Sequence, residues 1–188
     1  MIRFLLVMII IVCLTPPVMA GQKGSDRKAF NAEQKVKVKQ FHEQMKSENQ
    51  DFRQSLKGMT EEQKNAARKE HLEGQFDKRK AFHEKIHQEN KDFLTQRLQK
   101  NKNLSDAEKA EMISFFEEEY NEDISFREKQ NRENVDYFTK ISNDSSLTME
   151  QRKQALKTHR EQQKSENRNH REEEKSERKE IKNEIKKD

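Results

Sequence analysis

The sequence predicts an all-α protein, built from long antiparallel helices joined by short turns. Three observations lead to this prediction: helix-start signals recur four times, a twelve-residue pattern recurs along the chain, and both prolines lie before residue 18. Charged residues make up 39% of the chain and hydrophobic residues 30%. Such a composition is typical of disorder unless a helical pattern organises it. The repeats instead predict four tandem one-helix repeats that form a shallow bundle or cradle.

The first twenty residues, MIRFLLVMIIIVCLTPPVMA, differ from the rest of the chain. A basic residue at position 3 precedes an unbroken apolar run over residues 4–14, and a small residue, Ala20, ends the segment. This order predicts a secretory signal peptide over residues 1–20, with an uncleaved N-terminal anchor as the alternative. The helical domain then covers residues 21–188, in the periplasm or secreted, with no stable membrane insertion after cleavage.

Four pentads of one shape predict the helix starts. In each pentad an apolar residue precedes Asn, Ser or Thr, and Gln or Glu follows three residues later. The first polar side chain can accept a hydrogen bond from the N–H three residues on, and the Gln or Glu can bond back to the N–H of the cap residue, which makes a capping box. The four cap residues are Asn31, Thr60, Ser105 and Thr148.

Turn residues separate these starts. Gly58 offers a glycine stop to the first helix, and clusters of Asn, Asp and Ser occupy residues 101–103 and 142–146. The first helix is expected to be about three turns shorter than the others, and the short connections favour antiparallel neighbours. The predicted helices lie near residues 31–57, 60–99, 105–142 and 148–185.

A twelve-residue pattern recurs late in the predicted helices. It reads F-[HR]-E-x-x-x-x-E-N-x-D-[FY] at residues 41–52, 82–93 and 126–137, and a decayed copy, HREEEKSERKEI, occupies residues 170–181. Each copy lies inside one capped helix, so the repeat unit is one helix. Apolar residues spaced by three and four positions predict one stripe on each helix, interrupted at equivalent points by asparagine.

Two interpretations of this stripe are open. One is a coiled-coil-like bundle in which buried asparagines fix the register of the helices. The other is a half-exposed face whose rings contact a client protein. The fourth helix has few apolar residues after Leu156, which predicts either a solvated helix or an arm that orders on a partner. The candidate client-binding rings begin and end the pattern: Phe41, Phe52, Phe82, Phe93, Phe126 and Tyr137.

The sequence contains no readable catalytic constellation. It has a single cysteine, Cys13, no glycine-rich phosphate loop and no G-x-S-x-G motif, so the protein is predicted not to be an enzyme. Its 39 basic and 35 acidic residues alternate, which argues against a nucleic-acid partner. His83 and His87 lie four residues apart and form a candidate zinc or nickel site, with a structural use as the alternative. No other cofactor is expected.

The pentad Leu147-Thr148-Met149-Glu150-Gln151 is an LTxxQ motif, and residues 59–63 and 104–108 are near copies of it. With these pentads, the signal segment and its small helical chain, the sequence resembles the periplasmic Spy/CpxP-type family. The resemblance implies an ATP-independent chaperone (holdase) or envelope-stress protein, a homodimer that binds unfolded or partly folded proteins. A different expectation is a helical structural or signalling module that binds one folded partner or a metal ion.

Overall fold

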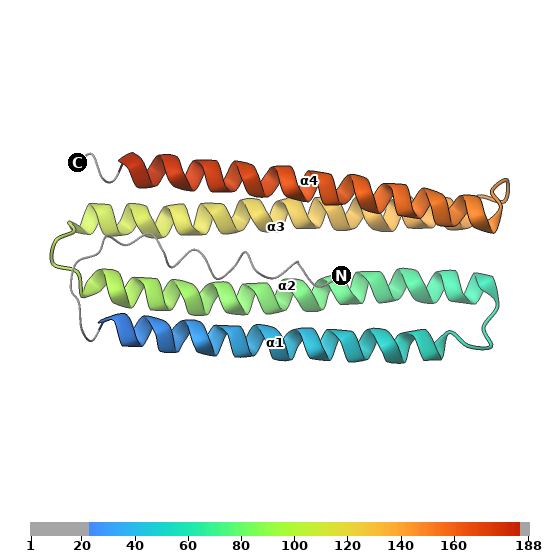
Figure 1. Cartoon of the computed structure of the whole chain (residues 1–188), viewed down its shortest axis with the longest axis horizontal. Coiled ribbons are helices and arrows are strands. Elements are labelled where there is room, and N and C mark those ends of the chain that lie inside the picture. Colours follow the sequence, from blue (N-terminus) through green and yellow to red (C-terminus); the bar gives the residue numbers. More distant parts are fainter. Residues whose placement is uncertain (1–22, 185–188) are drawn as a thin grey trace. The chain divides into compact units, whose positions relative to one another are not determined.

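The structure is a computed structural model. It describes residues 23–184, which form four α-helices and no strand (Figure 1). The all-α prediction is therefore confirmed. The expected signal peptide lies outside the described residues. Among the described helices, none combines the length and the apolar character that crossing a membrane requires. The helices are α1 (Lys23–Ser55), α2 (Glu61–Gln99), α3 (Asp106–Asn143) and α4 (Met149–Glu184).

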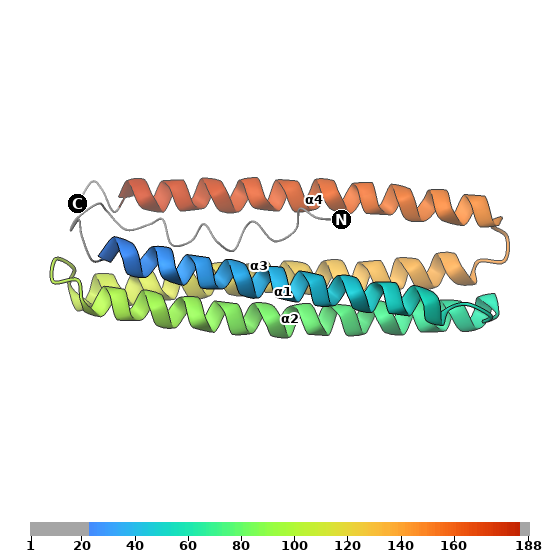
Figure 2. The same cartoon turned by 60° about the horizontal axis from the view of Figure 1, so that its bottom comes forward.

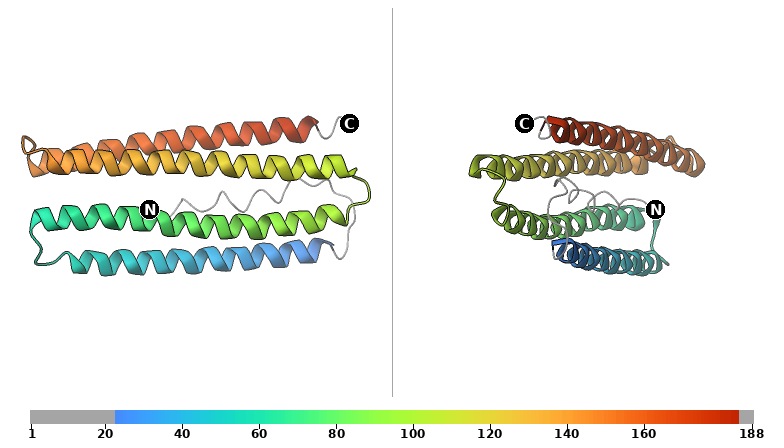
Figure 3. Two further views of the ribbon diagram at one scale, coloured as in Figure 1. Left: turned by 180° about the vertical axis from the view of Figure 1, so that it is seen from behind. Right: turned by 60° about the vertical axis from the view of Figure 1, so that its left-hand side comes forward.

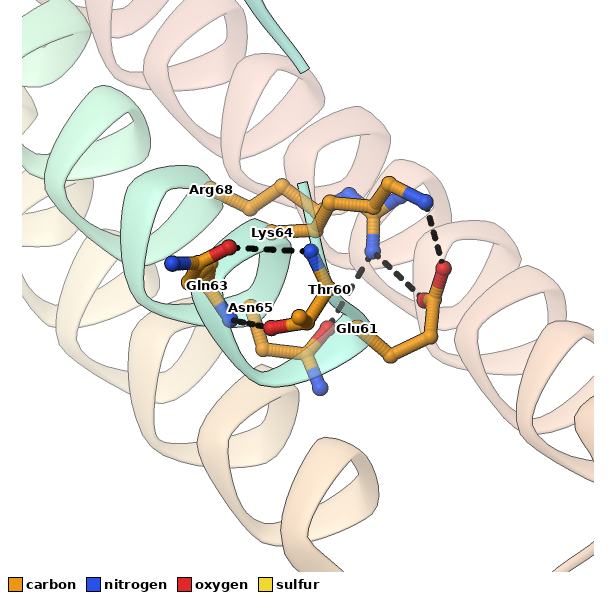
Figure 4. A network of polar contacts seen from close by, with 6 residues as sticks. All are labelled: Thr60, Glu61, Gln63, Lys64, Asn65 and Arg68. Atoms are coloured by element: carbon orange, nitrogen blue, oxygen red, sulfur yellow. Dashed lines mark hydrogen bonds and ion pairs between the residues drawn. The ribbon is translucent and has the colours of Figure 1, made fainter. Parts of the chain in front are cut away.

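Capping boxes start two of these helices as predicted. At α2 the Thr60 N–H donates to Gln63 Oε1 at 3.0 Å, and the Gln63 N–H donates to Thr60 Oγ1 at 3.3 Å (Figure 4). At α4 the corresponding distances between Thr148 and Gln151 are 2.8 and 3.2 Å. Each box satisfies N–H groups that the first turn of a helix leaves without a partner. The third helix begins directly after its predicted cap, Ser105.

The start of α1 differs from the prediction. The helix begins at Lys23 rather than near residue 31, so the pentad around Asn31 lies inside the helix and is not a cap. The preceding residues can continue the helix because no proline follows position 17, and Asp26 lies in the first turn, where a negative charge is favourable. With 33 residues against 36 in α4, α1 is not shorter by three turns.

The turn after α1 depends on Gly58. Its φ of 81° lies in the left-handed region, which a glycine adopts without the clash that a Cβ would cause. Gly58 therefore lies in the turn, as expected, but the helix ends at Ser55 and not directly before the glycine.

The chain divides into two compact units. One contains α1 and residues 81–105, and we call its two helical segments the α1/α2 pair. The other contains residues 59–80, α3 and α4, and we call the latter two helices the α3/α4 pair. The helix α2 is continuous from one unit into the other (Figure 2). The expected shallow bundle or cradle concerns both units together and stays a prediction.

Ring contacts give the direction of the helices within each pair. Residue numbers rise along one helix as they fall along the other, so each pair is antiparallel, as predicted (Figure 3). The contacts are Phe30–Phe93, Phe41–Phe82, Phe126–His170 and Tyr137–His159.

The hydrophobic core is thin. In the described part of the chain, no large side chain is fully buried. Polar side chains are buried as often as apolar ones, so the helices pack through a mixed layer and not through a continuous apolar seam. The buried apolar residues are Val38, Met45, Ile86, Leu98, Phe116, Val135 and Ile141, and the buried polar residues are Gln34, Gln75, His83, His87, Glu119, Gln130, Gln163 and Glu174.

Candidate functional site

Aromatic and histidine rings recur every eleven residues along each helix. Eleven residues make three turns at 3.67 residues per turn, so the rings return to the same face. In α1, α2 and α3, two members of the series are the first and last positions of the twelve-residue pattern, and a third lies eleven residues before it. In α4, one ring is the first position of the decayed copy, and the other lies eleven residues before it. The rings are Phe30, Phe41 and Phe52 in α1, His71, Phe82 and Phe93 in α2, Phe115, Phe126 and Tyr137 in α3, and His159 and His170 in α4.

Two phenylalanine stacks hold the α1/α2 pair together. The ring centroids of Phe41 and Phe82 lie 4.0 Å apart with parallel planes, so the first positions of two copies of the pattern face each other. Phe30 and Phe93 stack in the same way at 4.1 Å, and the guanidinium carbon of Arg97 lies 5.8 Å from the Phe93 centroid. Each stack contributes about 0.5–1.5 kcal/mol beyond the area that it buries.

The α3/α4 pair uses the same frame, and both stacked rings that come from α4 are histidines. Phe126 stacks on His170 with centroids 4.0 Å apart, and Tyr137 stacks on His159 at 4.2 Å. The Tyr137 hydroxyl also donates to the backbone oxygen of Ala155 at 3.4 Å. At the position equivalent to His170, the other pair has the carbon ring of Phe82.

The six predicted client-binding rings are all half-buried. Each ring therefore uses part of its surface for packing and keeps part of it accessible. Client binding by these rings stays a prediction. Stacking on a ring of the neighbouring helix is seen for Phe41, Phe82, Phe93, Phe126 and Tyr137.

The three repeated asparagines include one that joins two helices. Asn134 links two helices, because its Nδ2 donates to Gln163 Oε1 at 2.6 Å and its Oδ1 lies 3.1 Å from His159 Nε2. Asn49 Nδ2 donates to the backbone oxygen of Met45 in its own helix at 2.6 Å. Asn90 is half-buried, like the other two. The predicted register function is therefore supported by the geometry of Asn134.

Amide side chains form a network in the α3/α4 pair. The buried Gln163 donates to the backbone oxygen of Gln130 at 3.4 Å, and Asn167 Nδ2 donates to Gln130 Oε1 at 2.7 Å. Such a network fixes one arrangement of the two helices, because a slip would leave buried polar groups without partners.

A buried polar position precedes each copy of the pattern by seven residues. Sequence reasoning missed it, although glutamine at the same place in three copies, with glutamate in the remaining copy, was a readable signal. The four residues are Gln34, Gln75, Glu119 and Gln163.

Charged groups add a cross-helix link to the α1/α2 pair. Lys37 Nζ and Gln34 Nε2 each donate to Glu89 Oε2 at 2.7 Å. Burial raises the pKa of Glu89, but the hydrogen bonds from Lys37 and Gln34 outweigh burial and hold this pKa below its ordinary value. Hydrogen bonds to Glu33 and Glu89 raise the pKa of Lys37. The ionised forms of both partners are therefore favoured.

The predicted metal pair, His83 and His87, lies buried in α2, with 6% of each residue exposed. The ring of Phe82 meets His83 edge-on, at 6.3 Å between centroids. Within residues 23–184, neither histidine belongs to a group of three converging metal-ligand side chains. Metal binding by this pair stays a prediction.

A different group of ligand-type side chains converges in the α3/α4 pair. The ligand atoms of Asp123, His170 and Glu174 all lie within 4.8 Å of one another. Sequence reasoning missed this cluster because its members come from two helices and meet only in the antiparallel register. The signal in the sequence was the decayed copy of the pattern, where His170 and Glu174 replace residues that are apolar in the second copy.

No protein-family model matches the chain, and no curated protein or solved structure matches it significantly. The resemblance to the Spy/CpxP-type family therefore rests on the pentads, the signal segment and the small helical chain, and stays an expectation.

Proposed function

We propose that the protein is an ATP-independent chaperone, a holdase of the periplasm or of the secreted compartment, that binds unfolded or partly folded proteins. The observation that carries the proposal is the half-burial of the stacked rings in a thinly packed structure. Rows of partly accessible rings among charged side chains offer apolar contact surface without an extended apolar patch.

The proposed mechanism is weak and reversible contact, and it requires no chemical step. Apolar segments of a client contact the accessible parts of the rings, while Lys and Arg around them attract acidic segments and keep the complex soluble. Exchange of an internal stack for a client contact costs little, since one stack contributes only about 0.5–1.5 kcal/mol beyond its buried area. A homodimer, which is part of the proposal, doubles the number of ring rows.

Aggregation of a heat-sensitive client tests the proposal. We expect the purified protein to reduce light scattering at an equimolar ratio without ATP, and the double variant Phe41→Leu/Phe93→Leu to lose most of this effect. Both substitutions keep an apolar side chain in each helix, and circular dichroism checks that helicity is retained. The control is Val36→Ser, which removes an apolar side chain that is 54% exposed and lies outside the ring rows. Unchanged scattering with the unmodified protein would overturn the proposal.

A second candidate function is a structural or signalling module that binds one folded partner. The stacking of five candidate rings on rings of the neighbouring helix favours it, because these rings already contribute to the packing of their own helices. This candidate predicts one saturable complex in cross-linking and sedimentation experiments, together with no effect on client aggregation. The holdase predicts the opposite pair of results.

A further inference from the structure

We propose that Asp123, His170 and Glu174 form a binding site for a divalent transition-metal ion of the zinc type in the α3/α4 pair. Asp123 comes from α3, and the other two come from successive turns of α4. The site shares no residue with the predicted His83 and His87 pair, and it does not rest on the proposed chaperone function.

The distances suit a small cation. His170 Nε2 lies 3.4 Å from Glu174 Oε1 and 4.0 Å from Asp123 Oδ1. Metal–ligand bonds of about 2.0–2.2 Å place two ligands of a tetrahedral zinc ion about 3.4 Å apart. The His170–Glu174 separation already has this value, and Asp123 needs to approach by roughly 0.6 Å.

The imidazole of His170 is held in place for coordination. Its Nε2 is buried and makes no hydrogen bond with the part of the chain that the structure describes. The ring stacks on Phe126 with an angle of 27° between planes, which restricts its rotation. A buried nitrogen faced by two carboxylate oxygens is a donor set that zinc accepts, since it binds imidazole nitrogen and carboxylate oxygen.

The carboxylate of Asp123 is oriented by a neighbour. Arg127 Nε donates to Asp123 Oδ2 at 2.7 Å, so the other oxygen, Oδ1, is the one on the side of His170. Carboxylate ligands are commonly held by such an outer hydrogen bond, which fixes their orientation. A divalent ion adds two positive charges to a site with two carboxylates and one guanidinium, so its charge is compatible with the surroundings.

The repeat supplies an internal comparison. In the α1/α2 pair, the positions equivalent to the three proposed ligands are all apolar: Val38, Phe82 and Ile86. Val38 and Ile86 are buried, with exposed fractions of 8% and 3%. In the α3/α4 pair all three positions change together to metal-ligand types. Burial of such groups is costly unless they are paired or coordinate a metal, and a bound ion provides one reason for the joint change.

Metal binding would stabilise the packing of the C-terminal half of α4 on α3. Because the ligands come from two helices, the ion would link α4 to α3 in a region where α4 has few apolar residues after Leu156. A ligand that binds only the folded arrangement stabilises that arrangement. Three protein ligands also leave a fourth position, which water or an external ligand can occupy.

The proposal is tested by titrating the purified protein with zinc. Calorimetry monitors the titration, in competition with a chelator of known affinity. The test variants are His170→Phe, which restores the residue found in the other copies, and Glu174→Gln. The matched control is His159→Phe, a histidine of the same helix and the same ring row that lies outside the cluster. We expect the unmodified protein and the control to bind one equivalent of zinc. Both test variants should bind zinc at least tenfold more weakly.

Stability and amide exchange give a second readout. Zinc is expected to raise the melting temperature and the exchange protection of residues 163–176 in the unmodified protein and in the control, but in neither test variant. Circular dichroism shows whether each variant is folded, and Glu174→Gln keeps the test decisive if His170→Phe fails to fold. The proposal is overturned if the unmodified protein binds no zinc, if both variants bind it as well, or if only His83→Phe abolishes binding.

Discussion

The two antiparallel pairs share one frame but differ in chemistry. In the α1/α2 pair, phenylalanine stacks on phenylalanine, and an ion pair between Lys37 and Glu89 links the helices. In the α3/α4 pair, histidines of α4 stack on the rings of α3, and amide side chains join the helices.

This difference gives the two pairs different roles: one contributes mainly to stability, and the other mainly to fixing a single arrangement of its helices. Carbon rings gain free energy from burial with little demand on exact orientation. Imidazole and amide groups gain less from burial, but they penalise any arrangement that leaves them without partners. The first pair is therefore expected to contribute more to the free energy of unfolding, and the second to respond more strongly to ligands. Three variant experiments break or sharpen this comparison.

The largest effect is expected from Phe82→Ala, which breaks the stack on Phe41. It should lower the free energy of unfolding by about 2–3 kcal/mol, below the usual 3–5 kcal/mol for a buried phenylalanine because the ring is half-buried. The equivalent variant of the other pair, His170→Ala, should lower it by only about 1 kcal/mol, since an imidazole buries less apolar surface. Urea unfolding followed by circular dichroism measures both values. Equal losses in the two variants would contradict the comparison.

A smaller effect is expected in the amide network. Gln163→Ala should lower the free energy of unfolding by about 1–2 kcal/mol, because Asn134 loses its cross-helix acceptor. The contrasting variant is Gln130→Met, which installs the residue type found at the equivalent position, Met45.

Gln130→Met should stay within about 0.5 kcal/mol of the unmodified protein. The buried Nε2 of Gln130 has no hydrogen-bond partner among the described residues, and Asn167 keeps its bond to the backbone oxygen of Gln163. Urea midpoints of the two variants, measured together, test the contrast. A larger loss for Gln130→Met than for Gln163→Ala would show that the network is organised around Gln130.

The smallest effect is expected from the ion pair between Lys37 and Glu89, which links α1 and α2. The folded protein holds the pKa of Glu89 below its ordinary value of 4.5, so at acidic pH the unfolded chain binds a proton at this carboxyl more readily than the folded protein does. The stabilisation is therefore complete above the unfolded pKa and is lost as the pH falls through the lower folded value. The side chains of Lys37 and Glu89 are 30% and 26% exposed, so we expect only about 0.5 kcal/mol.

Unfolding measured between about pH 3 and pH 6 should reveal this contribution as a slope that Lys37→Met reduces. Added salt should weaken it as well, since partly exposed charges are screened. An unchanged slope in Lys37→Met would exclude the ion pair as its source.

Local signals in the sequence were sufficient for much of the fold. The helix starts at Thr60 and Thr148 were predictable because a capping box joins residues three positions apart, and its hydrogen bonds form within one turn. The same signal was misleading at Asn31. A cap forms only where the preceding residues leave the helix, and the residues before Asn31 continue it.

Contacts between helices were harder to predict. The Asp123, His170 and Glu174 cluster depends on the register of two helices, which no local motif specifies. The register becomes readable once equivalent positions are known to face each other, as Phe41 and Phe82 do. The sequence contained this information as an eleven-residue ring spacing, but the pattern alone did not indicate which helices pair.

The ring spacing also constrains how this chain can change in length. Insertion of eleven residues into both helices of a pair adds three turns and leaves every later side chain on its original face. Insertion of a single residue turns all later rings by about 100° and separates them from their partners. Viable deletions and insertions should therefore come in matched blocks, and the reach of each helical hairpin should vary in increments of about 16 Å.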